Sequence, residues 1–346
     1  MSKTLQDYAI LINDTIQSNE INHYITTDNM CQNLGGIDTF KNINIPQGKV
    51  RSFQKDDILL SNIRLYFRKV YRAKQKGGCS SDVLVFRAKH IDSATLFAIL
   101  SSQIFTDYAC LGSQGSKMPR GNKTHMMNFK IPTINFTIAK IFNSIQNKIE
   151  NNHKINELLH TFAYKIYEYY FKYKPKNAKL EQIIIENPKS SIMVKNAQKT
   201  QDKYPFFTSG DNILSYPKSI IDGRNCFLNT GGNAGIKFYV GKASYSTDTW
   251  CIGANEFSDY LYLLLSSIKT HINQSFFQGT SLKHLQKNLL KKYPIYMPSA
   301  HEIKKFNQII MPLLSLISIN TRISKKLEQI RDFLLPLLLK QQVKPK

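Results

Sequence analysis

The sequence predicts an α+β fold in which two similar mixed α/β domains are separated by two long helices that pack as an antiparallel coiled coil. Three observations predict it. Residues 1–135 and 175–298 combine short apolar runs with turn residues, which is typical of mixed domains. Residues 136–174 and 299–340 carry apolar side chains at three- and four-residue steps, which is typical of long amphipathic helices. Local motifs also recur in the same order in both halves.

The first domain is predicted from its apolar runs and their boundaries. Residues 57–63, 69–73 and 82–88 are rich in β-branched and aromatic side chains and predict strands. Residues 93–108 predict a helix, for which Asp92 or Ser93 is a suitable N-cap. A loop rich in glycine follows at 112–124.

The first long helix is predicted from period and from the absence of helix breakers. Apolar residues recur at helical spacing from Ile138 to Phe162, and no Gly or Pro interrupts the chain from Thr133 to Lys174. About 35 residues at 1.5 Å each give a helix roughly 50 Å long. Pro175 is predicted to end it.

The second half returns to the mixed pattern before it becomes helical again. Residues 225–230, 236–240 and 249–252 predict strands, and residues 259–272 predict a helix. A second long periodic segment begins at Ser299. Pro312 is predicted to kink this helix and Pro336 to disturb its end, because proline removes a backbone donor.

An internal duplication with a period of about 165 residues connects the two halves. Four matches occur in the same order, each at the same place in the succession of strand, helix, loop and long helix. They are Cys79–Asp82 with Tyr245–Asp248, Leu100–Ser102 with Leu265–Ser267, Gly115–Ser116 with Gly279–Thr280, and Asn152, Ile155 and Leu159 with Asn320, Ile323 and Leu327.

The two long helices need a partner, because each carries one apolar stripe that water solvates poorly. Packing the two helices on each other as an antiparallel pair buries both apolar stripes. At about 3.4 Å per base pair, such a rod would span roughly one and a half turns of duplex, so two similar domains could read a bipartite DNA site with a fixed gap. A helical dimerisation arm without a ruler role is the alternative.

The charge balance favours a polyanionic partner. Lys and Arg total 47 against 24 Asp and Glu, a net charge of +23. Nucleic acid is the simplest such partner and an anionic membrane the second, although a proteome rich in Lys and Asn would give the same bias. The five cysteines are scattered and form no CxxC pair, which indicates reduced thiols. No signal peptide or membrane span is evident, so a cytoplasmic protein is expected.

Candidate DNA-binding residues of the first half lie in two stretches. Arg and Asn can bind base edges bidentately, and glycines let a backbone approach a phosphate closely. Residues 57–74 and the loop 112–124 supply Asn62, Arg64, Tyr66, Arg68, Lys69, Lys117, Arg120 and Lys123. The alternatives are a solvated strand for the first stretch and a flexible surface loop for the second.

The second half offers a corresponding set. Residues 230–238 predict a β-hairpin that could enter a groove, although its glycines could also serve turn geometry alone. Residues 278–284 match the earlier basic loop. The candidates are Asn229, Asn233, Lys237, Lys283 and His284.

No catalytic or metal-binding motif is found. The histidines form no zinc pattern, and the adjacent Asp56 and Asp57 do not indicate joint metal binding. Residues 187–190 resemble the start of an amino-methyltransferase motif but lack the aromatic residue that should follow, so a loop is predicted. A nuclease or DNA methyltransferase that acts alone is the enzyme alternative, and a helical scaffold without DNA affinity is a third reading.

The duplicated pattern resembles the specificity (S) subunit of type I restriction–modification systems. The motifs that carry the resemblance are 24–30 with 33–37, GCSSDVLVFRAK (78–89), MPRG (118–121), FLNTGGNAGIKFY (227–239) and YSTDTWCI (245–252). The resemblance implies two target-recognition domains, at 1–135 and 175–298, each reading one half of a split asymmetric site in double-stranded DNA. It also implies spacer helices that dock methyltransferase subunits, a translocating restriction subunit as a further partner, and no catalytic residue, metal or cofactor in this chain. AdoMet would bind in the methyltransferase subunits, and ATP and Mg²⁺ in the restriction subunit.

Overall fold

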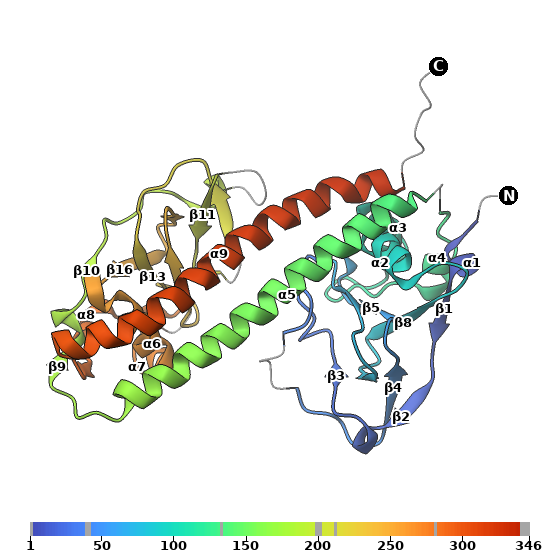
Figure 1. Cartoon of the computed structure of the whole chain (residues 1–346). Helices are drawn as coiled ribbons and strands as arrows, with labels where there is room; N and C mark the ends of the chain where they lie inside the picture. Colours follow the sequence, from blue (N-terminus) through green and yellow to red (C-terminus); the bar gives the residue numbers. More distant parts are fainter. Residues whose placement is uncertain are drawn as a thin grey trace. The chain divides into compact units, whose positions relative to one another are not determined.

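The computed structural model describes residues 3–38, 43–131, 134–197, 203–210, 213–279 and 282–339. The predicted match at Thr280 and the predicted helix end at residue 340 lie outside these ranges. The chain divides into two compact units, which are described separately (Figure 1). Unit 1 comprises Met1–Asn151 and Lys326–Lys346, and unit 2 comprises Asn152–Lys325.

Unit 1 contains two four-stranded sheets. The first has the order β1-β8-β5-β6, and all its neighbouring strands are antiparallel. The second has the order β2-β4-β7-β3, in which β3 and β7 are parallel. The strands are β1 (Ala9–Ile12), β2 (Thr15–Gln17), β3 (Tyr24–Ile25), β4 (Lys49–Phe53), β5 (Ile58–Ser61), β6 (Val70–Arg72), β7 (Gly77–Cys79) and β8 (Val83–Ala88).

The helix predicted at 93–108 in unit 1 is interrupted at Ser102. The single helix predicted at 93–108 is two helices that meet at Ser102, whose backbone is extended. Ser102 ends the first helix and caps the second, because its Oγ accepts a 3.2 Å hydrogen bond from the Phe105 amide. The helices are α1 (Leu5–Tyr8), α2 (Ser93–Ser101), α3 (Gln103–Leu111) and α4 (Lys123–Met127), with short 3₁₀ turns η1 (Ser18–Glu20) and η2 (Leu65–Phe67).

Unit 2 contains a four-stranded sheet in the order β10-β16-β13-β14, which corresponds to the sheet β1-β8-β5-β6 of unit 1. It also contains smaller sheets. Its strands are β9 (Ala178–Lys179), β10 (Ile185–Glu186), β11 (Tyr204–Phe207), β12 (Leu214–Tyr216), β13 (Arg224–Asn229), β14 (Ile236–Val240), β15 (Ser244–Tyr245), β16 (Thr249–Gly253), β17 (Phe277–Gln278), β18 (His284–Leu285) and β19 (Pro294–Ile295). Its helices are α6 (Ser258–Ser267), α7 (Lys269–Ser275) and α8 (Lys287–Lys291), with 3₁₀ turns η4 (Leu180–Gln182), η5 (Val194–Asn196) and η6 (Asn255–Phe257).

The main-chain hydrogen bonds repeat between the units. The Ser80 amide donates to the Ile25 carbonyl at 2.9 Å, and the Ser246 amide donates to the Phe207 carbonyl at the same distance. Each bond lies directly after a pair of parallel strands, β3 with β7 in unit 1 and β11 with β15 in unit 2. The sequence duplication therefore reflects a duplicated fold.

The central strands are apolar on both faces because each sheet is covered on both sides. In β8, Leu84 and Phe86 face a core that contains α2 and α3, while Val83 and Val85 join a second core with residues of β3 and β4. This alternation explains why residues 83–86 are a continuous apolar run, as is typical of a strand buried on both faces.

The two long helices are α5 (Phe136–Tyr167), which continues into a π-helical turn η3 (Glu168–Lys172), and α9 (Ala300–Leu338). The helix α9 continues through Pro312 and Pro336 as one element, so neither proline ends it. Each long helix contributes one segment to each unit.

The helix segments pack antiparallel within each unit. In unit 2, Asn152 Nδ2 donates to Ser324 Oγ at 3.1 Å, and Asn320 Nδ2 donates to Asn156 Oδ1 at 3.0 Å. The partner number on α9 thus falls as the number on α5 rises. Together with the repeated mixed units, this confirms the predicted fold class. Within the described ranges, no single helix is both long and apolar enough to cross a membrane.

Candidate nucleic-acid interface

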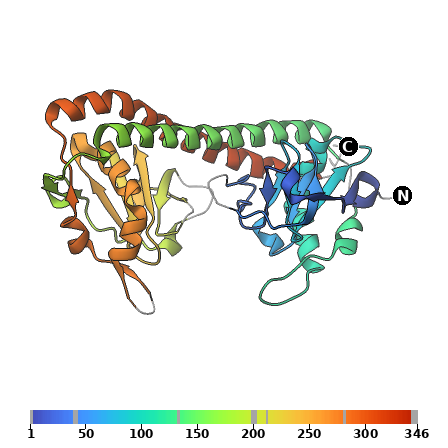
Figure 2. The ribbon, with the colours of Figure 1, turned by 90° about the horizontal axis from the view of Figure 1, so that it is seen from below.

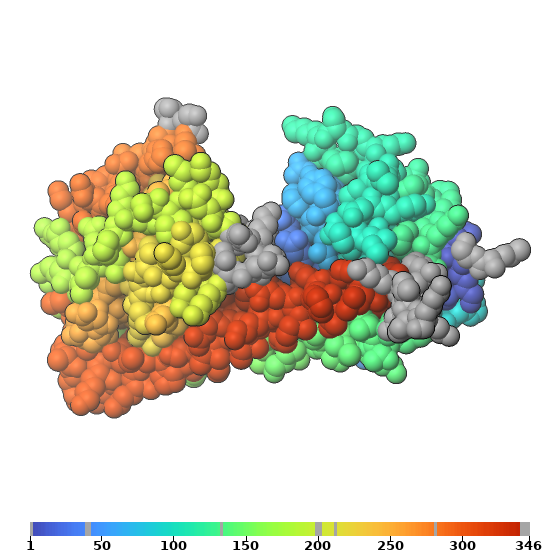
Figure 3. Space-filling view, turned by 90° about the horizontal axis from the view of Figure 1, so that it is seen from above, coloured from blue at the N-terminus to red at the C-terminus, as the bar shows by residue number. Residues whose placement is uncertain are grey.

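Each unit carries a projecting hairpin at the same place in its fold. Hairpin 1 consists of residues 114–120, and hairpin 2 of the paired strands β17 and β18 with the described residues 279, 282 and 283 between them. Figure 2 shows the teal hairpin 1 and the orange β17–β18 hairpin each extending from its own unit, and Figure 3 shows hairpin 1 as a projection of the surface of unit 1. A two-stranded ribbon of this kind is a shape that fits the major groove of DNA.

The hairpins share one main-chain design. In hairpin 1, Gln114 and Arg120 exchange backbone hydrogen bonds of 2.9 and 2.8 Å. In hairpin 2, Gln278 is the antiparallel partner of His284. A glycine follows the glutamine in both, with φ of +98° at Gly115 and +139° at Gly279. A Cβ at position 279 would lie 2.3 Å from the Leu282 carbonyl oxygen, so only glycine fits there.

The hairpins are also attached to their sheets in equivalent ways. The Gly121 amide donates to the Asn62 carbonyl at 3.2 Å, and the Leu285 amide donates to the Thr230 carbonyl at 3.0 Å. Asn62 and Thr230 in turn donate to the carbonyls of Asp82 and Asp248 at 2.7 and 3.2 Å. The ends of the central strands therefore position both hairpins.

The cations of the first candidate loop remain accessible. Lys117, Arg120 and Lys123 are exposed, and Lys123 is the first residue of α4. Arg120 forms a 3.0 Å ion pair with Asp82 and keeps 58% of its side chain exposed. An ion pair this exposed contributes little to stability and can open to bind a phosphate or a base. Tyr66 is also exposed and packs edge-on against Phe67.

Arg64 donates hydrogen bonds to the backbone of hairpin 1. Its backbone is left-handed, with φ of +50°, and its amide donates to the Pro119 carbonyl at 2.9 Å. Its Nη2 donates to the Lys117 carbonyl at 3.1 Å. Arg64 therefore holds the hairpin on both sides of position 118 rather than pointing freely into solvent.

Three further candidates of the first half have roles within the fold. The Asn62 side chain is buried, and its Oδ1 has no hydrogen-bond partner. Arg68 Nη2 donates to the Ser101 carbonyl at 2.9 Å, and burial lowers the pKa of its guanidinium. Lys69 Nζ donates to the Thr27 carbonyl. These three side chains are therefore held within the fold of unit 1.

The candidates of the second half also divide into side chains that are bonded within the fold and side chains that are exposed. Asn229 is buried, and its Nδ2 donates to the Asn233 carbonyl at 3.0 Å. Lys237 Nζ donates to the Thr208 carbonyl at 2.8 Å. The Asn229 bond lies within the turn between β13 and β14, and the Lys237 bond joins β14 to the residue that follows β11. Asn233, Lys283 and His284 are exposed, and the last two belong to hairpin 2.

Sequence reasoning missed several residues of this surface. Met118 and Leu282 are exposed apolar residues of the two hairpins. Lys287, the first residue of α8, lies over the Trp250 ring at 5.2 Å, and desolvation lowers the pKa of its ammonium group. The repeated tripeptide Gln-Gly-Ser/Thr at 114–116 and 278–280 is the sequence signal that aligns the two hairpins residue by residue.

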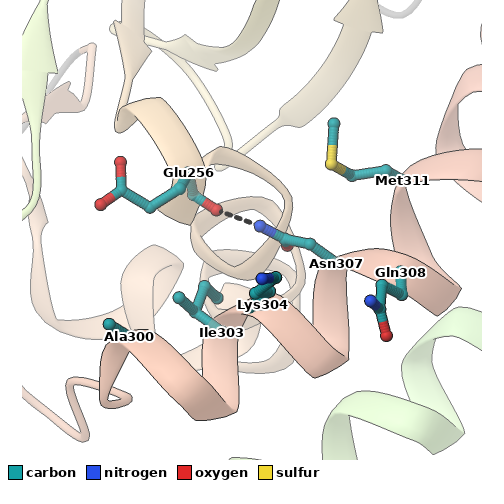
Figure 4. Close-up of a pocket in the computed structure, with 7 residues that line it drawn as sticks. All are labelled: Glu256, Ala300, Ile303, Lys304, Asn307, Gln308 and Met311. Carbon is teal, nitrogen blue, oxygen red and sulfur yellow. Dashed lines mark hydrogen bonds between the residues drawn. The ribbon is translucent and has the colours of Figure 1, made fainter.

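Metal-ligand clusters and pockets were the remaining places where a site could lie in the part of the chain that the structure describes. Within the described ranges, no group of three or more His, Cys, Asp or Glu side chains could hold a metal ion. An open pocket of about 510 Å³ lies in unit 2 beside the first turns of α9 (Figure 4). Asn307 Nδ2 crosses it to donate to the Glu256 carbonyl at 2.7 Å. Its lining has one carboxylate and one lysine, Glu256 and Lys304, and no nucleophile with a base.

Comparison with known proteins identifies the class of this fold and site. Residues 176–329 match the family described as the type I restriction modification DNA specificity domain. This match to the second half of the chain confirms the resemblance seen in its motifs. The predicted function is confirmed at the same level: the chain is a DNA-specificity subunit of a type I restriction–modification system.

The comparison with solved structures found two specificity subunits, of which the first has a similar fold. The type I restriction-modification system S subunit from M. genitalium has a TM-score of 0.63 and 13% sequence identity, over 99% of this chain and 96% of that one. The HsdS subunit from Thermoanaerobacter tengcongensis has a TM-score of 0.38 and 12% identity, over 99% and 97%. No curated protein matches the sequence.

Proposed function

We propose that each unit of this chain reads one half of a bipartite, asymmetric site in double-stranded DNA, and that its hairpin contacts the bases. The observation that supports this best is the contrast between a shared hairpin design and different side chains. Both hairpins begin Gln-Gly-Ser/Thr, but Arg120 in hairpin 1 corresponds to His284 in hairpin 2, and Pro119 corresponds to Lys283. Two hairpins that share a backbone design but carry different side chains can recognise two different half-sites.

The exposed cations supply the affinity that does not depend on sequence. Lys117, Arg120 and Lys123 lie on or directly after hairpin 1, and Lys283 and His284 lie on hairpin 2. Each phosphate contact releases condensed counterions, so several such contacts make binding strongly salt-dependent. The net charge of +23 acts in the same direction over a longer range.

We propose further that α9 docks helices of partner subunits. One stripe of α9 is used inside the units, where Phe306, Ile310 and Leu335 lie in the cores. A second apolar stripe recurs every seven residues and is 37–48% exposed; it consists of Ile309, Leu316, Ile323, Ile330 and Leu337. A seven-residue apolar repeat is the pattern that packs against another helix.

The partners of this proposal are the methyltransferase subunits and the restriction subunit of a type I complex. AdoMet would bind in the former, and ATP with Mg²⁺ in the latter, while this chain has no catalytic role. The helices α5 and α9 would also set the gap between the half-sites. A cytoplasmic location remains a prediction.

The test is to sequence the methylome of host cells with and without this gene, in the presence of the methyltransferase subunits. We expect a bipartite motif with two different halves to be methylated only when the gene is present. No change in methylation would overturn the proposal. A continuous motif would contradict its two-unit form.

Two cheaper measurements address the alternative functions. The purified chain is incubated with DNA, Mg²⁺ and AdoMet, where an enzyme that acts alone would give cleaved or methylated product and we expect none. A gel shift on random duplex separates a DNA-binding subunit, which retards the duplex at low salt, from a scaffold, which does not.

A further inference from the structure

Hairpins 1 and 2 each expose one large apolar side chain at the same position. Met118 follows Gln114 by four residues, and Leu282 follows Gln278 by four. Met118 is 53% exposed and Leu282 is 57% exposed. An isolated exposed apolar residue is common, but its recurrence at the projecting end of two duplicated hairpins is specific to this position.

The backbone around each of these side chains is held in place. The carbonyls on either side of Met118, those of Lys117 and Pro119, accept hydrogen bonds of 3.1 and 2.9 Å from Arg64. In unit 2, the Lys283 carbonyl after Leu282 accepts a 2.9 Å bond from the Gly232 amide. Neither Met118 nor Leu282 is part of an apolar core of its unit. Both side chains are thus exposed to solvent next to residues whose backbone is hydrogen-bonded to the same unit.

The charged neighbours indicate what these side chains contact. Lys117 and Arg120 flank Met118, and Lys283 and His284 follow Leu282. Such a setting repels a basic protein surface and attracts a polyanion. In the major groove, the apolar group that a base presents is the C5-methyl of thymine, and a two-stranded ribbon is narrow enough to enter that groove.

We propose that Met118 and Leu282 are specificity-determining residues, each of which packs against a thymine methyl group in the half-site read by its own unit. This rests on the proposed function, because it assigns one base-reading contact to each unit. Burial of one or two methyl-sized groups corresponds to a roughly three- to tenfold change in affinity per contact.

The experiment uses the full chain in complex with its methyltransferase subunits and the duplex motif that the methylome defines. Each thymine of the motif is replaced in turn by deoxyuridine, which lacks only the methyl group. Affinity is measured by fluorescence anisotropy for the wild type, Met118→Ala and Leu282→Ala. Matched controls are Ile10→Ala in unit 1 and Ile220→Ala in unit 2, which remove exposed apolar side chains away from the hairpins.

We expect the wild type to lose affinity about three- to tenfold at one deoxyuridine in each half-site. Met118→Ala should abolish that sensitivity in one half-site only, and Leu282→Ala in the other, while both controls keep it in both. Each variant should bind the unmodified motif more weakly by the same factor.

Other outcomes separate this inference from the proposed function. If the wild type directs bipartite methylation but neither variant changes the response to deoxyuridine, the inference is wrong and the proposed function stands. The same holds if a half-site contains no A·T pair, or if Met118→Ala weakens binding to all duplexes equally, as a non-specific wedge would. If the wild type directs no methylation, both fail.

Discussion

Arg331 on α9 donates a 3.0 Å hydrogen bond from Nη1 to Oε1 of Gln146 on α5, and both side chains are buried in unit 1. Arg331 Nη2 donates to the Asn33 carbonyl at 3.3 Å, and Gln146 Nε2 donates to the Leu34 carbonyl at 2.8 Å. The network therefore joins both long helices to a loop whose residues 33 and 34 have left-handed backbones. Directional bonds of this kind fix which residues of two helices face each other.

Replacing Arg331 should destabilise unit 1. Arg331→Met keeps much of the buried volume but leaves the Gln146 and Asn33 oxygens without donors, at about 1–3 kcal/mol for each group. We expect the urea midpoint of unfolding to fall, as measured by circular dichroism. Lys305→Ala, which removes an exposed side chain of α9, should leave the midpoint unchanged. An unchanged midpoint for Arg331→Met would show that the network is dispensable.

The start of α9 should make stability depend on pH. The Ser299 amide donates to Glu302 Oε2 at 2.9 Å, and this bond, with one from the Tyr296 hydroxyl, lowers the pKa of the Glu302 carboxyl to about 2. Because the pKa is lower in the folded state than the ordinary value of 4.5, the stabilisation is complete above that value and is lost as pH falls toward 2.

The matching measurement compares the wild type with Glu302→Gln. The difference in their thermal midpoints should be largest above pH 5 and should shrink as the pH is lowered through the window between 4.5 and 2. Glu181→Gln, an exposed carboxylate in the same unit, serves as the control. A difference that stays constant over this range would contradict the assignment.

The exposed cations of hairpin 1 should contribute to DNA affinity regardless of sequence. Lys117→Ala and Lys123→Ala should each weaken binding to target and random duplex alike, and each should reduce the log–log salt slope by about one. Anisotropy titrations at several salt concentrations measure both effects. Lys55→Ala, an exposed lysine in the turn between β4 and β5, is the matched control. A loss confined to the target sequence would indicate base reading instead.

The second stripe of α9 should hold the partner subunits. Ile323→Asp and Ile330→Asp place a charge on an exposed position, so the fold should persist while co-purification with methyltransferase subunits is lost. Ile10→Asp makes the same change on β1 and should have no effect on assembly. Retained assembly in both α9 variants would show that the partners dock elsewhere.

Much of the fold was predictable because its signals are local. The strand predicted at 82–88 is β8 at Val83–Ala88, since a strand buried on both faces leaves an unbroken apolar run. The break at Ser102 was not predictable, because Ser102 forms its cap only when the chain turns there. The continuity of the second long helix was predicted, and α9 passes through Pro312 while the flanking residues Ile310 and Leu314 lie in the core of unit 2; the kink at Pro312 stays a prediction.

Two loops that the sequence indicates form the projecting hairpins, but the surroundings of their individual side chains could not be predicted, and DNA contact stays a prediction. Whether a cation is free depends on distant carbonyls, and nothing near Arg68 in the sequence shows that Ser101 will accept its hydrogen bond. The left-handed backbones of Arg64 and Arg68 are equally invisible, because residue type favours them only weakly outside glycine. Met118 was overlooked since an isolated methionine in a basic loop has no periodic signal.

The glycines at 115 and 279 have a consequence for how such a protein acquires new targets. Each glycine has a backbone that favours glycine, and main-chain bonds join the strands beside it, so the exposed side chains of Met118 and Leu282 take no part in these contacts. A substitution at one of these positions can change which bases are preferred without endangering the folding of the chain. Selection can therefore change the base pairs preferred in each half-site separately, through single substitutions.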